Sequence, residues 1–192
     1  MAARDGHARS GVSDADWAAA VKAVRAAVPA GRILLVCHVN PDGDALGSML
    51  AFGLGLRRLG VAHLQATFPG PAEVPEPFRG LPGLDLLVPE RSAMTDPDLV
   101  VTFDAASVSR LGLLADRLSR APSVVLDHHA SNPGFGHVNI VDPDAAATSV
   151  VADELLRRLD VPLDAEIAEC LYVALATDTG SFRFDTTTPE VH

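Results

Sequence analysis

The sequence has few of the features that mark secreted or membrane proteins. It contains only two cysteines, Cys37 and Cys170, which are too few to build a disulfide framework. No apolar run approaches the roughly 20 residues that a transmembrane helix requires. The first residues, MAARDGHARSGVSD, contain no apolar stretch of the kind found in secretory signals. These absences predict a cytoplasmic protein that does not bind a membrane.

Positive charge is also scarce. The chain has 15 basic and 25 acidic residues, a formal net charge of −10. A protein that grips long duplex nucleic acid needs a basic surface, so this composition argues against such a partner. It does not exclude a small phosphorylated substrate, because divalent cations bound in a carboxylate-rich pocket reverse the local field. Solubility is the simpler explanation of the acidity.

Apolar residues are abundant enough to form one sizeable core. They make up 48% of the 192 residues, which indicates a folded chain with a single domain. We expect residues 1–12 to form a flexible tail and residues 13–192 to form the domain. Neither internal repeats nor low-complexity segments interrupt it.

Short apolar runs alternate with segments of helical spacing. Strands are predicted at 33–38, 61–68, 98–104, 123–129 and 137–142. Helices are predicted at 13–28, 45–59, 107–119, 147–160 and 164–177, and a terminal strand or hairpin arm at 181–188. Ser13 is predicted to cap the first helix. Continuously apolar strands that alternate with helices are typical of an α/β fold, with a mostly parallel sheet and helices on both faces.

Acidic and imidazole side chains follow three of the predicted strands. His38, Asp42 and Asp44 lie at or just after the end of the strand at 33–38. Asp104 ends the strand at 98–104, and Asp127, His128 and His129 end the strand at 123–129. Open α/β sheets bind ligands at the carboxyl ends of their strands, so we expect these side chains to lie at one edge. Asp178 ends an apolar helix and can reach the same edge.

These residue types indicate a metal site. So many carboxylates repel one another unless cations lie between them. Oxygen and imidazole ligands suit Mn²⁺ or Mg²⁺ better than Zn²⁺. One ion would leave ligands unused, whereas a pair of ions that share a bridging carboxylate uses them all and can activate a water for phosphoryl transfer.

Four segments, in this order, resemble the DHH family of phosphoesterases. They are CHVNPDGDALGS (37–48), VTFDAAS (101–107), VLDHHASN (125–132) and ATDTGSFRF (176–184). The first and last are most similar to the branch of bacterial oligoribonucleases that also act as phosphatases of 3′-phosphoadenosine 5′-phosphate (PAP). The resemblance extends from about residue 15 to the last residue.

The resemblance implies a role for each matching residue. One metal ion would be held by His38, Asp42 and Asp104, and the other by Asp44, Asp104, His128 and Asp178. Asp104 would bridge the two ions. His129 would serve as hydrogen-bond donor or general acid, and Asp127 would orient a histidine. Substrate contacts are assigned to Ser149 and Arg183, although a helix cap for Thr148 and Ser149 and a surface position for Arg183 are the simpler expectations.

The resemblance also predicts an activity. The expected protein is a Mn-dependent phosphoesterase, a 3′–5′ oligoribonuclease and nucleotide phosphatase, which hydrolyses short RNA oligonucleotides or 3′-phosphonucleotides with two Mn²⁺ ions, Mg²⁺ being the alternative. Rival functions are hydrolysis of cyclic or linear dinucleotides, manganese pyrophosphatase activity, and nucleotide binding without turnover. A homodimer is compatible with the sequence.

Similar family members continue into a second, smaller domain that binds substrate. The sequence stops at TTTPEVH, so we expect a truncated chain that lacks the second domain. Such a chain would contain every predicted metal ligand and hydrolyse substrate weakly.

Overall fold

The computed structural model describes residues 11–28, 30–189 and 191. Its helices are α1 (Asp14–Ala27), α2 (Gly43–Arg58), α3 (Thr148–Arg158) and α4 (Ala165–Asp178). Its strands are β1 (Arg32–Cys37), β2 (His63–Thr67), β3 (Leu99–Phe103), β4 (Ser123–Asp127) and β5 (Val138–Val141). Four 3₁₀ segments complete the described elements: η1 (Glu76–Phe78), η2 (Leu84–Leu86), η3 (Glu90–Ser92) and η4 (Val108–Arg117). Of the tail predicted at 1–12, residues 1–10 lie outside the described residues.

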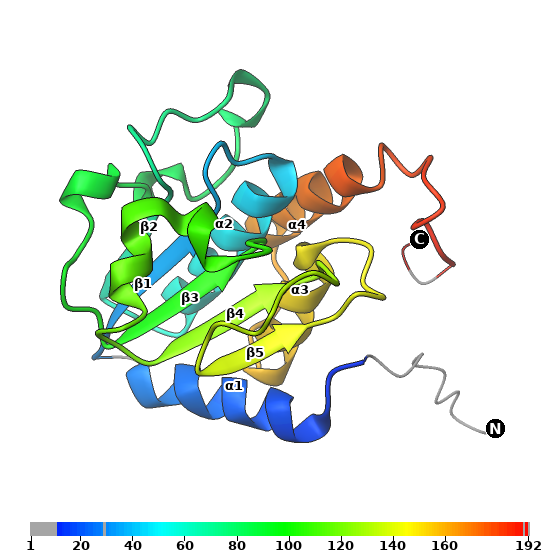
Figure 1. The fold of residues 1–192 in the computed structure, drawn as a ribbon. Helices are drawn as coiled ribbons and strands as arrows, with labels where there is room; N and C mark the ends of the chain where they lie inside the picture. The colour runs from blue at the N-terminus through cyan, green and yellow to red at the C-terminus, as the bar shows by residue number, and fades with distance from the viewer. Residues whose placement is uncertain (1–10, 29, 190, 192) are drawn as a thin grey trace.

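The described strands form one parallel sheet in the order β2-β1-β3-β4-β5 (Figure 1). The predicted α/β fold with a parallel sheet is thereby confirmed. The larger core joins α1, α2 and α3 to one face of the sheet, and α4 packs on α2. On the other face, η4 covers a smaller core that includes Leu34 and Val100. Neighbouring strand positions point to opposite faces, so both faces require apolar residues, and the strands are continuously apolar.

The helices begin at capping residues. The side chain of Ser13 accepts a hydrogen bond from the amide of Asp16 and caps α1, as predicted. The helix predicted at 45–59 begins two residues earlier, at Gly43, and Asp42 caps it by accepting from the amide of Ala45. Asp42 therefore combines a local structural role with its position at the end of β1.

Two predicted elements differ from the structure. The helix predicted at 107–119 is the 3₁₀ segment η4, which Gly112 interrupts with a φ of 54°. The strand predicted at 181–188 was wrong, since the described residues there form turns. Ser181 and Phe182 have positive φ values of 60° and 63°, and the amide of Ser181 donates to the carbonyl of Ala176. Left-handed backbone begins at Gly180, just after the end of α4, and is incompatible with an extended strand.

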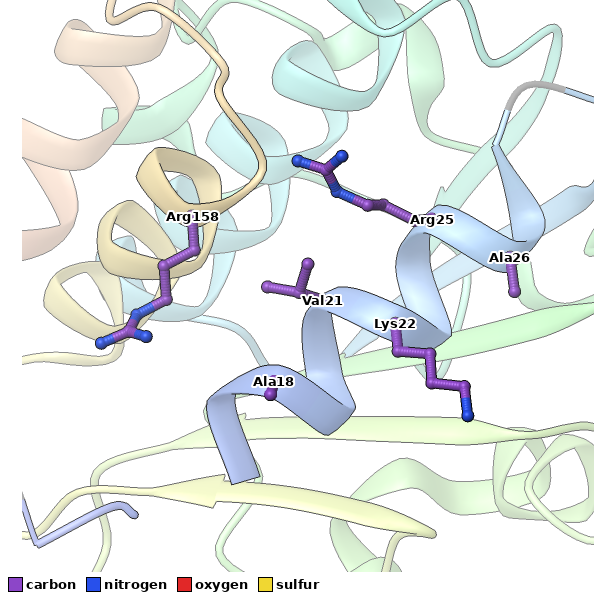
Figure 2. Close-up of a pocket in the computed structure, with 6 residues that line it drawn as sticks. All are labelled: Ala18, Val21, Lys22, Arg25, Ala26 and Arg158. Carbon is purple, nitrogen blue, oxygen red and sulfur yellow. The ribbon is translucent and has the colours of Figure 1, made fainter. Parts of the chain in front are cut away.

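Helix α1 makes charged and aromatic contacts with the end of α3 and with the turn that follows it. The guanidinium of Arg158 lies 4.9 Å from the ring centroid of the buried Trp17, and Arg25 pairs with Asp160 at 2.6 Å. Figure 2 shows the hollow between these elements, which is lined by Ala18, Val21, Lys22, Arg25, Ala26 and Arg158. Arg158 is the last residue of α3, so this hollow lies at the opposite end of that helix from Thr148. Among the described residues, no helix is long and apolar enough to cross a membrane.

Close packing of α2 against α4 depends on Gly47. A Cβ atom at this position would lie 2.4 Å from the carbonyl oxygen of Cys170 and 2.9 Å from the Cβ of Ala174. We expect Gly47→Ala to lower the free energy of unfolding by about 1–3 kcal/mol, because backbone atoms cannot move away as a flexible side chain can. Urea denaturation measures this loss. Gly80→Ala is the control, since a Cβ there would meet no atom within 4 Å; equal stability of the two variants would contradict the expectation.

Candidate metal centre

The strand register brings the predicted ligands to one level of the sheet. Cys37 is the partner of Phe103, and Phe103 is the partner of Leu126, so the residues that follow β1 and β3 emerge side by side with the end of β4. In this strand order the chain turns to opposite sides after β1 and β3. Such a switch point is where open α/β sheets place their ligand crevice.

Asp104 lies at the centre of this crevice. It leaves β3 with a φ of 54°, and only 3% of its surface is exposed. Its Oδ2 lies 3.3 Å from Nε2 of His38, whereas its Oδ1 lies 3.7 Å from Nε2 of His128 and 3.5 Å from Nδ1 of His129. The two oxygens of one carboxylate therefore face two different histidine groups.

Around Asp104 the predicted ligands form two groups. Within each group the ligand atoms lie within 4.8 Å of one another. The groups are His38, Asp42 and Asp104 on one side, and Asp44, His128 and Asp178 on the other. In the second group, Nε2 of His128 lies 3.0 Å from Oδ2 of Asp178 and 3.8 Å from Oδ2 of Asp44. Both are sets of oxygen and imidazole donors, which fit a hard divalent cation.

Burial makes negative charge in the second group costly unless a cation or a proton neutralises it. Asp44 is completely buried; burial first, and then the charges of Asp104 and Asp178, raise its pKa to about 8. Burial lowers the pKa of His128, but its hydrogen bond to Asp178 and the charges of the neighbouring carboxylates raise it to about 9. In the metal-free protein, protons therefore take the place of positive charge that a metal ion would supply.

The imidazole of His38 is held through its second nitrogen. Nδ1 lies 2.8 Å from the carbonyl oxygen of Val39 and 2.9 Å from Nη2 of Arg110. When Nδ1–H donates to Val39 and Nε2 gives up its proton, the lone pair of Nε2 is available to a metal ion beside Asp104 and Asp42, the arrangement of a metal-ligating histidine. Burial lowers the pKa of His38, but the hydrogen bond to Asp104 and the neighbouring acids outweigh it, so the net pKa is raised.

Asp127 organises the end of β4. Its buried Oδ1 accepts from the amides of His128 and His129 and from Nδ1 of His129, at 2.8, 3.2 and 2.7 Å. Its Oδ2 accepts from Asn132 at 2.6 Å. Burial raises the pKa of Asp127, but these hydrogen bonds lower it by more than burial raises it, so the net pKa of the carboxyl group is below its usual value. The hydrogen bond to Asp127 raises the pKa of His129.

The two residues assigned to substrate contact occupy different surroundings. Ser149 is 2% exposed at the start of α3, and its amide donates to Oδ1 of Asp44 at 3.1 Å. Arg183 is exposed, and its Nε donates to the carbonyl of Gly180. In the part of the chain that the structure describes, no hydrogen bond or ion pair joins Arg183 to the carboxylates. Contact of either residue with substrate remains a prediction.

Three further side chains at the site were not singled out from the sequence. Ser48 donates to Oδ1 of Asp44 at 3.0 Å, and Arg110 and Asn132 contact His38 and Asp127 as described above. Ser48 and Asn132 lie within the segments that resemble the DHH family, close to predicted ligands, so the sequence could have indicated that they belong to the site. Arg110 follows Asp104 by six residues, and only the turn into η4 returns it to His38.

The raised pKa values predict how pH affects the metal-free protein. Asp44 titrates near 8 in the fold against 3.8 ordinarily, and His128 near 9 against 6.5. Over this window the folded state binds more protons than the unfolded state, so the free energy of unfolding falls as pH rises from about 4 to 9. A metal ion competes with these protons, so its stabilising effect grows over the same range. Thermal melts with and without Mn²⁺ in deoxygenated buffer measure both trends, and metal-free stability that rises with pH would contradict the first.

Comparison with known proteins identifies the family of this chain. Residues 32–175 match the DHH family, N-terminal domain, and the chain therefore belongs to the DHH family. It is 36% identical over 162 residues to the bifunctional oligoribonuclease and PAP phosphatase NrnA of Thermus thermophilus, covering 84% of this chain and 47% of that protein. It is 30% identical to the Bacillus subtilis protein of the same description, covering 81% and 49%.

Two solved structures share the fold. An exopolyphosphatase-related protein from Bacteroides fragilis superimposes with a TM-score of 0.84 at 23% identity, covering 96% of this chain and 56% of that one. The exonuclease RecJ, solved with bound manganese, gives a TM-score of 0.50 at 21% identity, covering 83% and 41%. This chain spans about half the length of the curated relatives it matches.

Proposed function

We propose that this chain is the metal-dependent catalytic domain of a phosphoesterase that hydrolyses short oligoribonucleotides and 3′-phosphonucleotides such as PAP. The observation that carries the proposal is the position of Asp104, whose two oxygens face separate groups of oxygen and imidazole ligands. The description of the NrnA relatives as oligoribonucleases and PAP phosphatases supports the substrate class. The net charge of −10 favours short substrates over long duplexes.

Two Mn²⁺ ions are the proposed cofactors, with Mg²⁺ as the alternative. The donor set favours either ion, and the manganese bound to RecJ, a protein of similar fold, favours the first. When bound, such a pair lowers the pKa of a water and neutralises charge on the transferring phosphoryl group. His38, Asp42 and Asp104 would hold one ion, and Asp44, Asp104, His128 and Asp178 the other.

His129 is the proposed proton donor. Its Nδ1–H is engaged by the carboxylate of Asp127, which fixes the ring and raises its pKa. The ring is half-exposed, in contrast to the buried His38, so it can reach a substrate in the crevice. A protonated imidazole in this position can donate to the leaving oxygen when the phosphate ester is cleaved.

The proposal is tested by incubating the purified chain, in excess over substrate, with Mn²⁺ and a panel of phosphate compounds. The panel contains a short oligoribonucleotide, PAP, a cyclic dinucleotide, a linear dinucleotide and pyrophosphate. Single-turnover conditions detect slow hydrolysis, and chromatography identifies the products. We expect mononucleotides from the oligoribonucleotide, inorganic phosphate from PAP, and no reaction in chelator.

Each other outcome identifies a different function. Preferential hydrolysis of pyrophosphate, or of one of the dinucleotides, would replace the proposed substrate with that compound. Nucleotide binding without turnover, in a chain that binds Mn²⁺, would identify a binding module. Equal hydrolysis of the oligoribonucleotide with and without chelator would exclude metal-dependent catalysis.

A further inference from the structure

The first turn of α3 is bound to the metal centre. The residue before the helix, Ala147, offers no side-chain cap. Two amides of the first turn donate instead to the carboxylate of Asp44, more than 100 residues earlier in the chain: the amide of Thr148 to Oδ2 at 2.7 Å, and that of Ser149 to Oδ1 at 3.1 Å. Asp44 thus satisfies amides at the start of a helix other than its own. This places the start of α3 at a fixed position relative to the ligands.

Thr148 makes a second contact in the same crevice. Its hydroxyl donates to Oδ1 of Asp104 at 3.1 Å, and both side chains are buried. One residue therefore binds the carboxylate of Asp44 through its backbone and that of Asp104 through its side chain. Because the β-branched side chain of threonine has few rotamers, the hydroxyl is held stiffly once the backbone is fixed.

The orientation of Asp104 requires such a restraint. The terminal torsion of an aspartate is broad, so an unrestrained carboxylate can rotate and direct both oxygens to one side. To be shared between the two ligand groups through both of its oxygens, the carboxylate must direct one oxygen toward each group. The Thr148 hydroxyl donates to Oδ1, which is thereby held on the side of His128 and His129, while Oδ2 faces His38.

We propose that Thr148 is a positioning residue, whose hydroxyl orients Asp104 so that its carboxylate is shared between the two ligand groups. This inference rests on the two-metal site of the proposed function. Thr148 does not itself hold a metal ion, and its effect is transmitted through Asp104.

The test is Thr148→Val, which keeps the shape of the side chain and the backbone amide and removes the hydroxyl. We expect binding of Mn²⁺ to weaken about 10–100-fold, the usual effect of removing a hydrogen-bond partner of a metal ligand. The electron paramagnetic resonance spectrum of the chain loaded with Mn²⁺ should lose the signature of an exchange-coupled pair. Thr148→Ser retains the hydroxyl and should restore both the affinity and the coupled spectrum.

Thr102→Val is the matched control. Thr102 is also fully buried and lies two residues before Asp104, but in the described structure its hydroxyl has no hydrogen-bond partner. The same substitution there should leave Mn²⁺ binding and the coupled spectrum unchanged. Thermal melts of the metal-free variants verify that each one folds.

The outcomes separate the two proposals. Wild-type affinity and a wild-type coupled spectrum in Thr148→Val would overturn the role of Thr148, as would a Thr148→Ser variant as defective as Thr148→Val. If the wild-type chain bound no coupled pair of Mn²⁺ ions, the two-metal site itself would be refuted. If Thr148→Val did not fold, Thr148→Ser with wild-type binding and Thr148→Ala with weakened binding would support the inference, and equal binding by both would overturn it.

Discussion

Asp104→Asn is expected to abolish binding of the metal pair and to lower the hydrolysis rate by at least about 10²–10³-fold. Loss of the shared carboxylate forfeits several kcal/mol of charge stabilisation, and each 1.36 kcal/mol corresponds to a factor of about ten. Asparagine is the appropriate substitute because Asp104 has a φ of 54°, and asparagine tolerates left-handed backbone better than alanine does. Its Oδ1 can still accept from Thr148.

Stability measurements distinguish this effect from misfolding. Removing the charge beside the buried Asp44 relieves repulsion, so the metal-free variant should melt no lower than the wild type. Addition of Mn²⁺ should raise its melting temperature far less than it raises that of the wild type. Asp144→Asn removes one exposed carboxylate and should retain the full Mn²⁺ effect. A wild-type Mn²⁺ shift in Asp104→Asn would remove Asp104 from the metal centre.

His129→Ala is expected to slow hydrolysis by about 10²–10⁴-fold, the usual contribution of a positioned proton donor. Binding of Mn²⁺ should be retained, because neither ligand group described above requires His129 to be complete. The measurement pairs single-turnover rates on a short oligoribonucleotide with the number of Mn²⁺ ions bound at saturation. The expected pattern is a slow enzyme with a full complement of metal.

A competing interpretation of His129 predicts the opposite pattern. His129 also forms a compact group with Asp104 and His128, so it could serve as a ligand. Loss of a bound Mn²⁺ ion in His129→Ala would establish that role and refute the assignment as proton donor. His63→Ala, at an exposed position at the start of β2, controls for the loss of a histidine and should change neither measurement.

Much of the site could be predicted because it depends on local sequence. An apolar run followed by polar residues indicates a buried strand and its carboxyl end, and parallel strands bring those ends to one edge. His38, Asp104 and Asp127 lie at that edge for this reason. Their chemistry is a property of the side chains alone, so the predicted class of metal needed no coordinates.

Local patterns were less informative where backbone conformation departs from regular structure. The predicted strand at 181–188 failed because Ser181 and Phe182 adopt left-handed backbone that ordinary residue preferences do not signal. The predicted helix at 107–119 is a 3₁₀ segment because Gly112 interrupts it. In both places one or a few residues with positive φ override the propensity of the surrounding residues.

Apart from the segment at 181–188, the sequence by itself determined which segments form the strands of the sheet, where they end to within two residues, and which ligand types gather there, because these follow from hydrophobic pattern and side-chain chemistry. Only the tertiary structure decided how the ligands divide between the two oxygens of Asp104 and that Thr148 holds one of them. Those contacts join residues 24 or more positions apart, from His128 and Asp104 to Thr148 and Asp44. They depend on the placement of α3 against the ends of the strands, which packing of the whole core sets to within a fraction of an ångström.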